Sequence, residues 1–158
     1  MRIPRLYLET SVFNFVFADD APDKKADTLK LFQEIKAGKY QPFTSAYVVQ
    51  ELEKASESKR EKMLRLLDEY GIVPLIPNDE VTRIAELYIS HGVIPAKYDT
   101  DALHIAAATV LDLEIIASWN FKHIVKRKTI EQTGIINLRE GYKSVLILSP
   151  KGVTEYGK

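Results

Sequence analysis

The chain contains no cysteine, so disulfide bonds and thiolate metal sites are excluded at the outset. It also has no excess charge, because 22 Lys and Arg residues balance 22 Asp and Glu residues. Balanced charge argues against a protein that coats nucleic acid by bulk electrostatics, although it permits a small local phosphate site. No apolar run approaches the roughly 18 residues of a membrane span. Residues 1–5 lack the apolar segment of a signal peptide, so we expect a cytoplasmic protein with no membrane partner.

What the chain does have is enough apolar sequence for a substantial core. Hydrophobic residues make up 46% of its 158 residues, a length typical of one domain. The sequence predicts a single domain over residues 1–150. The tail over residues 151–158 is expected to be loosely held.

Short apolar runs alternate with longer stretches of helical periodicity, which is the pattern of an α/β protein. Pro74 interrupts one run and predicts a strand at the edge of the sheet. Asn78 predicts a helix cap, residues 58–61 (Ser-Lys-Arg-Glu) predict a capping box, and Gly38 and Gly92 predict helix ends. Strands are predicted over 5–8, 41–44, 72–76, 114–118 and 144–148, and helices over 23–37, 46–55, 58–70, 79–90, 100–111 and after residue 123.

This alternation of strands and helices predicts a mostly parallel central sheet with helices on both faces. Ligands of such folds bind beyond the carboxyl ends of the strands. Glu9 follows the first predicted strand, and Ser118 and Asn120 stand at the same end of the strand over 114–118. We therefore expect these side chains to lie near one another.

Acidic residues supply the strongest chemical signal. Asp99 and Asp101 stand at the start of an alanine-rich helix, where the helix dipole alone favours an acid. Glu9 and Glu51 provide two more acidic positions. Clustered carboxylates repel one another unless a cation neutralises them, and an oxygen-only ligand set suits Mg²⁺ or Mn²⁺.

Each of these residues also has a structural interpretation. Glu51, at the border of its helix's apolar stripe, would equally well form a salt bridge with a lysine. Asp99 is either a helix cap or an auxiliary ligand. His104 is interpreted as a packed core histidine, and Trp119 either stacks on a base or packs under the sheet. The basic run over 122–128 is either a solvated face or a contact for RNA phosphates.

Four segments resemble the PIN-domain family in order and rough spacing. They are Tyr7-Leu-Glu-Thr-Ser-Val12, the helical Glu51, Asp101-Ala-Leu-His-Ile-Ala-Ala-Ala108 and Ala117-Ser-Trp-Asn-Phe-Lys-His-Ile124. The resemblance extends from Leu6 to about Leu148. It implies a three-layer α/β/α sandwich and a metal-dependent nuclease. Stand-alone members of this size are commonly VapC-type toxins, which cleave RNA, form homodimers and are inhibited by a small antitoxin encoded nearby.

The resemblance also implies roles for individual residues. The family's three main acids fall on Glu9, Glu51 and Asp101. The family's hydroxyl two residues after the first acid falls on Ser11. Its last acid falls on Asn120, with Ser118 at the usual threonine position. Two positions depart from the commonest pattern, because aspartate is usual at 9 and at 120; glutamate reaches one carbon further, and asparagine loses a charge.

We therefore interpret the chain as an Mg²⁺- or Mn²⁺-dependent endoribonuclease, the toxin of a toxin–antitoxin pair. Its expected metal ligands are Glu9, Glu51 and Asp101, assisted by Asp99, with Asn120 completing the catalytic set. Its expected RNA contacts are Lys122, Lys126 and Arg127. A second hypothesis is a catalytically weak PIN-like module that binds RNA or protein. A receiver-type phospho-acceptor domain is set aside, since no acceptor aspartate with a nearby lysine is evident at the end of a central strand.

Overall fold

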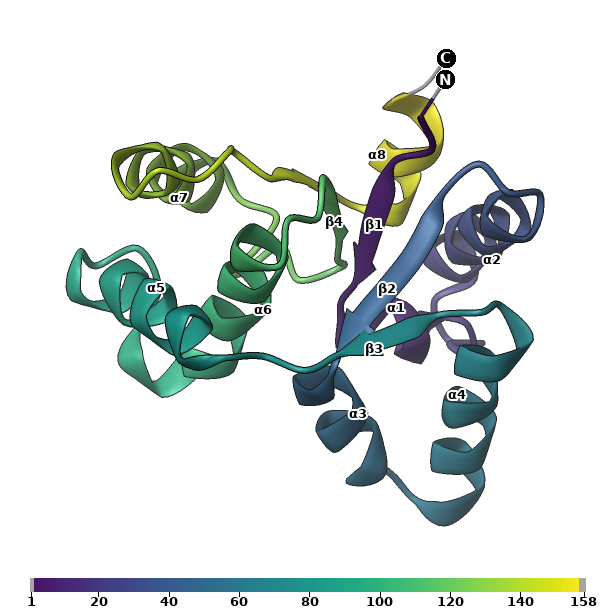
Figure 1. Ribbon diagram of the computed structural model, residues 1–158. Coiled ribbons are helices and arrows are strands. Elements are labelled where there is room, and N and C mark those ends of the chain that lie inside the picture. Colours follow the sequence, from purple (N-terminus) through teal and green to yellow (C-terminus); the bar gives the residue numbers. More distant parts are fainter. Residues whose placement is uncertain (1, 157–158) are drawn as a thin grey trace.

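The computed structural model describes residues 2–156, and within them five strands form one sheet. All strand pairs are parallel, in the order β3-β2-β1-β4-β5 (Figure 1). The strands are β1 (Arg5–Leu8), β2 (Gln41–Ser45), β3 (Val73–Leu75), β4 (Ile115–Ala117) and β5 (Leu146–Leu148). The helices are α1 (Thr10–Phe15), α2 (Pro22–Lys36), α3 (Ala46–Glu53), α4 (Glu57–Glu69), α5 (Asp79–Ser90), α6 (Asp99–Val110), α7 (Arg127–Arg139) and α8 (Pro150–Tyr156), with a 3₁₀ turn, η1, at Ala96–Tyr98.

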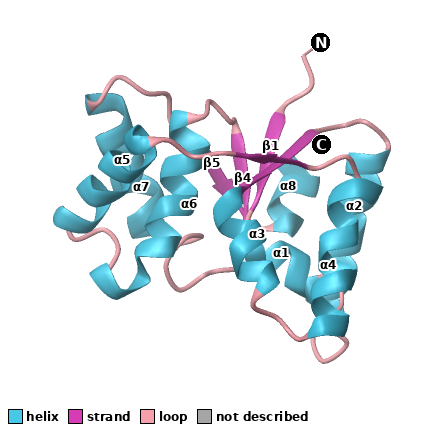
Figure 2. Ribbon diagram, turned by 60° about the horizontal axis from the view of Figure 1, so that its bottom comes forward, coloured by secondary structure: helices cyan, strands magenta, loops and turns pink. Residues whose placement is uncertain are grey.

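The helices cover the sheet on two sides. Figure 2 shows α5, α6 and α7 on one side and α1, α2 and α8 on the other. The predicted α/β/α sandwich is confirmed, and the mostly parallel sheet is parallel throughout the described residues. No helix within residues 2–156 is long and apolar enough to cross a membrane.

The strand order reverses between β1 and β4. From the central β1 the chain builds β2 and β3 outward on one side, then crosses to β4 and β5 on the other. Leu8 is paired with Ala117 at the ends of β1 and β4, and the Glu9 N–H donates to the Ala117 carbonyl at 3.1 Å. Such a switch point is where open α/β sheets bind ligands. Glu9 and Ser118 are the first residues beyond it.

The core explains why α6 is rich in alanine. Residues 106–108 and Ala102 are completely buried, and α6 packs against both α5 and β4. Small side chains let a helix that is covered on several sides approach its neighbours closely. This close packing holds the first turn of α6, which carries Asp101, near the carboxyl ends of β1 and β4.

Several local signals were interpreted correctly. The strand that contains Pro74 lies at the edge of the sheet. Asn78 caps α5, its Oδ1 accepting from the Val81 N–H at 3.2 Å. Gly38 and Gly92 follow α2 and α5 with φ of 82° and 72°, a left-handed conformation that only glycine adopts at little cost.

One helix was missed from the sequence, and one local prediction was wrong. Helix α1 was not predicted, because its six residues are too short to show helical periodicity and its aromatic residues alternate as in a strand. The capping box over 58–61 is wrong, since α4 begins at Glu57 and Ser56 is its N-cap. The Arg60 N–H donates to the Ser56 carbonyl at 2.7 Å, which places Ser58 inside the first turn.

The C-terminal tail is not loosely held over residues 151–156. These residues belong to α8, which packs against α2 and buries Val153 completely. The Tyr40 hydroxyl also donates to the Val153 carbonyl at 3.1 Å. The prediction failed because a seven-residue helix owes its stability to tertiary packing rather than to its own sequence. Residues 157 and 158 of the predicted tail lie outside the described residues.

Candidate active site

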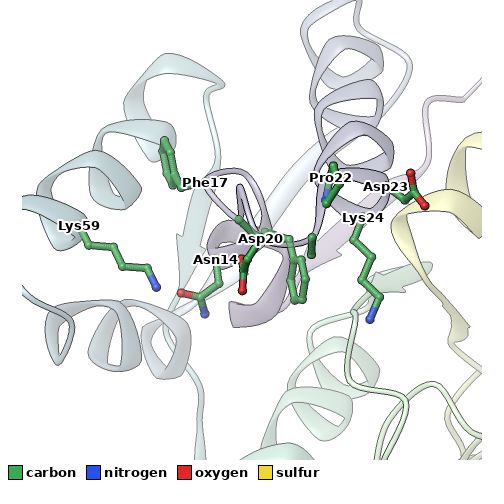
Figure 3. A pocket seen from close by; sticks show the side chains of 10 residues that line it. Asn14, Phe17, Asp20, Pro22, Asp23, Lys24 and Lys59 are labelled. Carbon is green, nitrogen blue, oxygen red and sulfur yellow. The ribbon is translucent and has the colours of Figure 1, made fainter.

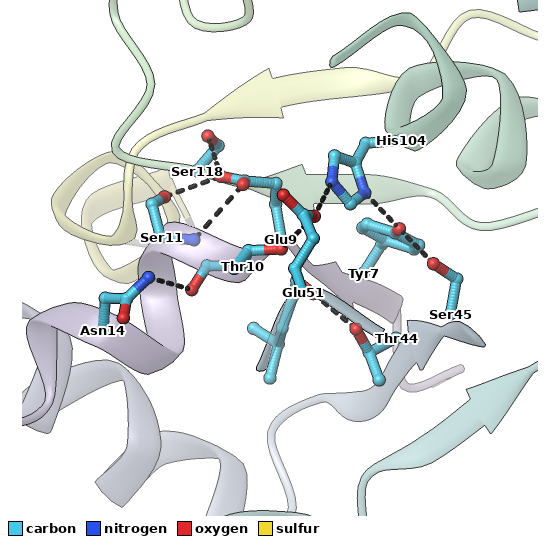
Figure 4. A network of polar contacts seen from close by, with 11 residues as sticks. Tyr7, Glu9, Thr10, Ser11, Asn14, Thr44, Ser45, Glu51, His104 and Ser118 are labelled. Atoms are coloured by element: carbon cyan, nitrogen blue, oxygen red, sulfur yellow. Dashed lines mark hydrogen bonds and ion pairs between the residues drawn. The ribbon is translucent and has the colours of Figure 1, made fainter. Parts of the chain in front are cut away.

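Glu9 is a buried carboxylate at the centre of the switch point. Its side chain is only 5% exposed, and it serves as the N-cap of α1. Oε1 accepts from the hydroxyls of Ser11 (2.6 Å) and Ser118 (2.5 Å), and Oε2 accepts from the Ser11 N–H at 3.2 Å (Figure 4). The two serines singled out from the sequence therefore converge on Glu9.

Backbone groups set the direction of these two hydroxyls. The Ser11 hydroxyl accepts from the Trp119 N–H at 2.8 Å, and the Ser118 hydroxyl accepts from the Asn120 N–H at 2.9 Å. Each serine thus directs its own hydrogen toward Glu9. Glu9 Oε1 is held firmly, while Oε2 has one longer hydrogen bond.

Glu51 reaches the site from α3 and is held by a chain of buried groups. Its Oε1 accepts from the Thr10 hydroxyl at 2.6 Å and lies 2.8 Å from His104 Nε2. His104 Nδ1 lies 2.7 Å from the Tyr7 hydroxyl, which lies 2.7 Å from the Ser45 hydroxyl. Figure 4 shows this chain running from Ser45 to Glu51. The ion-pair partner of Glu51 is therefore a histidine and not the lysine expected as one alternative.

The charges of His104 and Glu51 stabilise each other. Burial by itself lowers the pKa of His104, but the Glu51 hydrogen bond and the nearby carboxylates raise it above its ordinary value. Burial raises the pKa of Glu51, yet His104 and Thr10 bring it below its ordinary value. The structure therefore favours a charged His104–Glu51 pair in the interior. His104 is completely buried, so its interpretation as a core histidine is confirmed.

Asp101 lies in the first turn of α6. Burial raises the pKa of its carboxyl, and the negative charge of Glu9 adds to this effect. A hydrogen bond from the Asn120 side chain and the charges of His104 and His123 act in the opposite direction. The fold therefore brings Asp101 close to Glu9 and Asn120.

Glu9 and Asp101 share one further property, the lack of a basic partner. None of the ion pairs found within residues 2–156 includes either carboxylate. Buried acids usually have a cationic partner or are neutral, because desolvation penalises an isolated charge. Within residues 2–156, these two acids therefore bring negative charge to the site that no ion pair neutralises.

Asp99 does not join the other acids. It is exposed and lines a separate cavity of about 390 Å³ with Tyr47 and Glu86, which none of Glu9, Glu51 and Asp101 lines. It is not the cap of α6 either, because Tyr98 occupies that position. The physical reason is helical geometry, since two residues along a helix are separated by about 200° around its axis.

The predicted basic contacts lie in two different places, and Lys122 lies beside Tyr98. Lys122 Nζ lies 5.6 Å from the centre of the Tyr98 ring, and Lys97 Nζ lies 5.2 Å from the same ring. Tyr98 in turn packs on His123, which interacts electrostatically with Asp101. Lys97 was missed from the sequence, although its position just before the acidic segment was a usable signal.

The other two predicted basic contacts lie at the start of α7. Lys126 is exposed as the N-cap of that helix. Arg127 is also exposed, and its Nε donates to Glu131 Oε1 at 2.9 Å. Part of the Arg127 charge is therefore already engaged.

Trp119 packs inside the protein, where little of its ring is accessible to a base. It is 8% exposed, and its Nε1 donates to the Thr28 hydroxyl of α2 at 2.8 Å. Its ring lies against Phe15 and Phe121. The packing alternative therefore holds, with α2 and α1 as the neighbours of the ring. The exposed aromatic of this loop is Phe121.

A second cavity runs beside α1. Its volume is about 540 Å³, within the range of ligand pockets. Figure 3 shows Lys59 of α4 extending toward Asn14, with Asp20 in the connection between α1 and α2. Because α1 begins next to Glu9, the cavity and the acidic site share this helix.

Carboxylates are the candidate donors for a divalent cation at this site. Within residues 2–156, no three acidic or histidine side chains are gathered as the ligands of one ion. Glu9 and Asp101 nevertheless supply carboxylate oxygens in an electrostatically coupled pair, with the Asn120 amide beside Asp101. Two carboxylates with water in the remaining positions suit Mg²⁺, which commonly keeps several waters. Glu9 and Asp101 would therefore be the two residues that hold such a cation.

The chain thus combines a parallel α/β/α architecture with acidic side chains at the switch point of its sheet. A family model of the PIN domain matches residues 6–124, and the chain belongs to the PIN-domain family. Domains of this family are generally nucleases and generally use divalent metals. A comparison with curated proteins found no match.

Proposed function

We propose that this protein is a divalent-metal-dependent endoribonuclease and acts as the toxin of a toxin–antitoxin pair. The observation that carries the proposal is the pair of coupled carboxylates, Glu9 and Asp101, at the switch point of the sheet, which take part in no ion pair within residues 2–156. Membership of the PIN-domain family supports nuclease chemistry at this position.

Electrostatics explains why a cation would bind there. Burial raises the pKa of Asp101 and Glu9 raises it further, so the folded protein disfavours two negative charges at this point. A divalent cation removes that penalty and gains two carboxylate ligands. Mg²⁺ and Mn²⁺ both match an oxygen-only donor set.

The chain's own residues have separate tasks in this proposal. Ser11 and Ser118 hold Glu9 Oε1, so the carboxylate keeps one orientation. His104 and Thr10 both bind Glu51 Oε1. We propose that Glu51, oriented in this way, keeps its negative charge at a fixed position in the site. When bound, a divalent cation polarises a phosphodiester and lowers the pKa of a bound water.

A hydrolytic reaction also agrees with the state of His104. Both of its ring nitrogens are engaged, so it has no nitrogen left to take a proton from a ribose 2′-hydroxyl. We therefore expect attack by water and products with 5′-phosphate and 3′-hydroxyl ends. Lys97 and Lys122 provide positive charge for the flanking phosphates of the strand.

The decisive experiment is cleavage of a labelled single-stranded RNA pool with Mn²⁺, compared with an EDTA control. We expect cleavage by the wild type only with the cation. A wild-type protein that binds the pool yet leaves it intact would instead support the alternative, a PIN-like binding module.

Asn120→Asp sharpens this experiment. An aspartate keeps an acceptor for the His123 N–H, which Asn120 Oδ1 now binds at 2.9 Å, but loses the donor that faces Asp101. The variant adds a negative charge beside Asp101 and should therefore raise the thermal stabilisation by Mn²⁺. In a binding module without a cation, the same charge would weaken RNA binding.

The partners of the protein are part of the proposal. We propose a homodimer inhibited by a small antitoxin encoded nearby and working in the cytoplasm. The dimer is what the family resemblance implies. Within residues 2–156 none of the exposed large hydrophobic side chains lies on α3 or α4. Three of them, Ile130, Ile135 and Leu138, lie on α7. Light scattering at tens of micromolar protein tests the dimer, and a monomer mass would contradict it.

A further inference from the structure

Phe121 exposes an aromatic ring next to the candidate active site. Its side chain is 48% exposed, although it belongs to the same short loop as the buried Trp119. The two rings meet edge to face, with centroids 5.9 Å apart and planes at 76°. Trp119 thus packs on Phe121 from one side, and about half of the Phe121 side chain remains exposed to solvent.

A lysine completes this cluster. Lys24 Nζ lies 5.3 Å from the ring centre of Phe15, 5.6 Å from that of Trp119 and 5.5 Å from that of Phe121. Within residues 2–156 Lys24 is in none of the ion pairs, so its charge is balanced by aromatic rings rather than by a carboxylate. Such a cation keeps its attraction for an anion.

The cluster is joined directly to the acidic site. The Trp119 N–H donates to the Ser11 hydroxyl, which donates to Glu9. Asn120, the neighbour of Asp101, stands between Trp119 and Phe121 in the loop. Lys24 and Phe15 also line the cavity beside α1, on whose rim Figure 3 shows Lys24 (lower right). A strand bound at the acids would therefore pass this cluster.

We propose that the exposed face of Phe121 is a stacking subsite for an unpaired nucleobase and that Lys24 contacts a phosphate of the same strand. This subsite rests on the proposed ribonuclease function and names its substrate as single-stranded. Stacking on an aromatic ring tolerates every base, whereas base pairing would hide the face that Phe121 needs. A half-exposed ring, Phe121, stands beside Lys24, which is in none of the ion pairs within residues 2–156. This combination favours a nucleotide over an apolar protein side chain.

Binding measured in EDTA tests the subsite independently of cleavage. The probe is a short labelled single-stranded RNA, and the matched probe is the same strand with abasic sites. We expect Phe121→Leu to weaken binding of the normal strand about tenfold, which is the order of one lost base stack, and to leave the abasic strand unaffected. Phe121→Tyr keeps the ring and should bind as the wild type does.

Two further variants complete the design. Lys24→Gln should weaken binding of both strands and flatten their salt dependence, since a phosphate contact is present in each. Leu138→Ala is the control, because Leu138 is 64% exposed on α7, away from the loop. Trp119 is the only tryptophan of the chain, so its fluorescence should change when a base stacks on the neighbouring Phe121.

The outcomes separate the subsite from the ribonuclease. If Phe121→Leu binds the normal strand as tightly as Leu138→Ala does, the subsite is wrong even when the enzyme cleaves RNA. If Phe121→Leu loses base-dependent binding but the wild type never cleaves, the subsite stands and the ribonuclease proposal fails. If the wild type binds no single strand in EDTA, the subsite is wrong.

Discussion

Two acidic networks in this protein are built on opposite principles. On the surface, Arg83 of α5 donates to Glu80 through Nε and Nη2 at 2.7 and 2.8 Å and to Glu140 through Nη1 at 2.7 Å. The Tyr142 hydroxyl adds a bond to Glu80 at 2.5 Å. Hydrogen bonds from Arg83 and Tyr142 lower the pKa of Glu80 to about 2. The acids of this surface network thus find their hydrogen-bond and ion-pair partners within the protein itself.

The acids at the switch point are less well compensated. Glu9 is held by hydroxyls, which orient a carboxylate without neutralising it. Burial raises the pKa of Asp101, the opposite direction from Glu80. Among these acids, only Glu51 forms an ion pair in the part of the chain that the structure describes, and its partner is His104. The comparison indicates that the surface network stabilises the fold, whereas the buried network retains negative charge. Our proposal assigns that charge to the binding of a divalent cation.

The largest expected effect separates activity from stability at Asp101. Asp101→Asn should lower RNA cleavage roughly 10²-fold or more, because it removes a charge that the cation needs. The same change should raise the melting temperature in EDTA, since a raised pKa means that folding disfavours the ionised carboxyl at neutral pH. Cleavage assays and thermal melts measure the two effects.

The corresponding change at Glu80 provides the control. Glu80→Gln should lower the melting temperature slightly and leave cleavage unchanged, because Glu80 already has its cation in Arg83. A metal-dependent melting shift of unaltered size in Asp101→Asn would show that Asp101 is not a ligand.

A second, smaller effect concerns the hydroxyl of Tyr7. Tyr7→Phe leaves His104 Nδ1 and the Ser45 hydroxyl without this buried partner, which should destabilise the fold by about 1–3 kcal/mol. Cleavage should also fall, because His104 then orients Glu51 less firmly. Urea unfolding and cleavage at saturating RNA measure these losses.

Tyr88→Phe is the matched variant. The Tyr88 hydroxyl is also buried and bonds to Asn137 and Thr109, far from the acids in the α5–α7 layer. Its loss should destabilise the protein by a similar amount without changing cleavage of the folded enzyme. Equal losses of activity in the two variants would argue that the contacts from Tyr7 through His104 do not position Glu51.

A third effect compares Lys122, which is in none of the ion pairs within residues 2–156, with the paired Arg127. Lys122→Gln should weaken single-strand binding and reduce the slope of log K against log salt by about 0.7, the value for one phosphate contact. Arg127→Gln should do less, since Arg127 already bonds to Glu131. Binding titrations at several salt concentrations test this, and equal slopes for both variants would contradict it.

The smallest effect is the pH dependence of the Glu80 network. The folded pKa of about 2 lies below the ordinary value of 4.5, so the network stabilises the protein fully above pH 4.5. This contribution is lost as the pH falls through 4.5 toward 2. The difference in urea midpoint between wild type and Glu80→Gln should therefore be small at pH 7 and shrink in acid. A difference that grows in acid would reverse the assigned sign.

Much of the fold and part of the site were determined by the sequence alone. Apolar runs and helical periods located all five strands, and Pro74, Asn78 and Gly92 marked an edge, a cap and a helix end. These signals are local, because each depends on the backbone conformation of a few neighbouring residues. The placement of Glu9 beyond β1 followed directly, since a residue after a parallel strand stands at its carboxyl end.

Tertiary structure alone decided which side chains face one another. It paired Glu51 with His104 rather than with a lysine, turned Asp99 away from Asp101, and exposed Phe121 while burying Trp119. It also packed the tail against α2 as α8. These outcomes depend on the directions in which elements distant in the chain present their side chains. Neither periodicity nor residue type contains that information, because it arises only when the helices dock on the sheet.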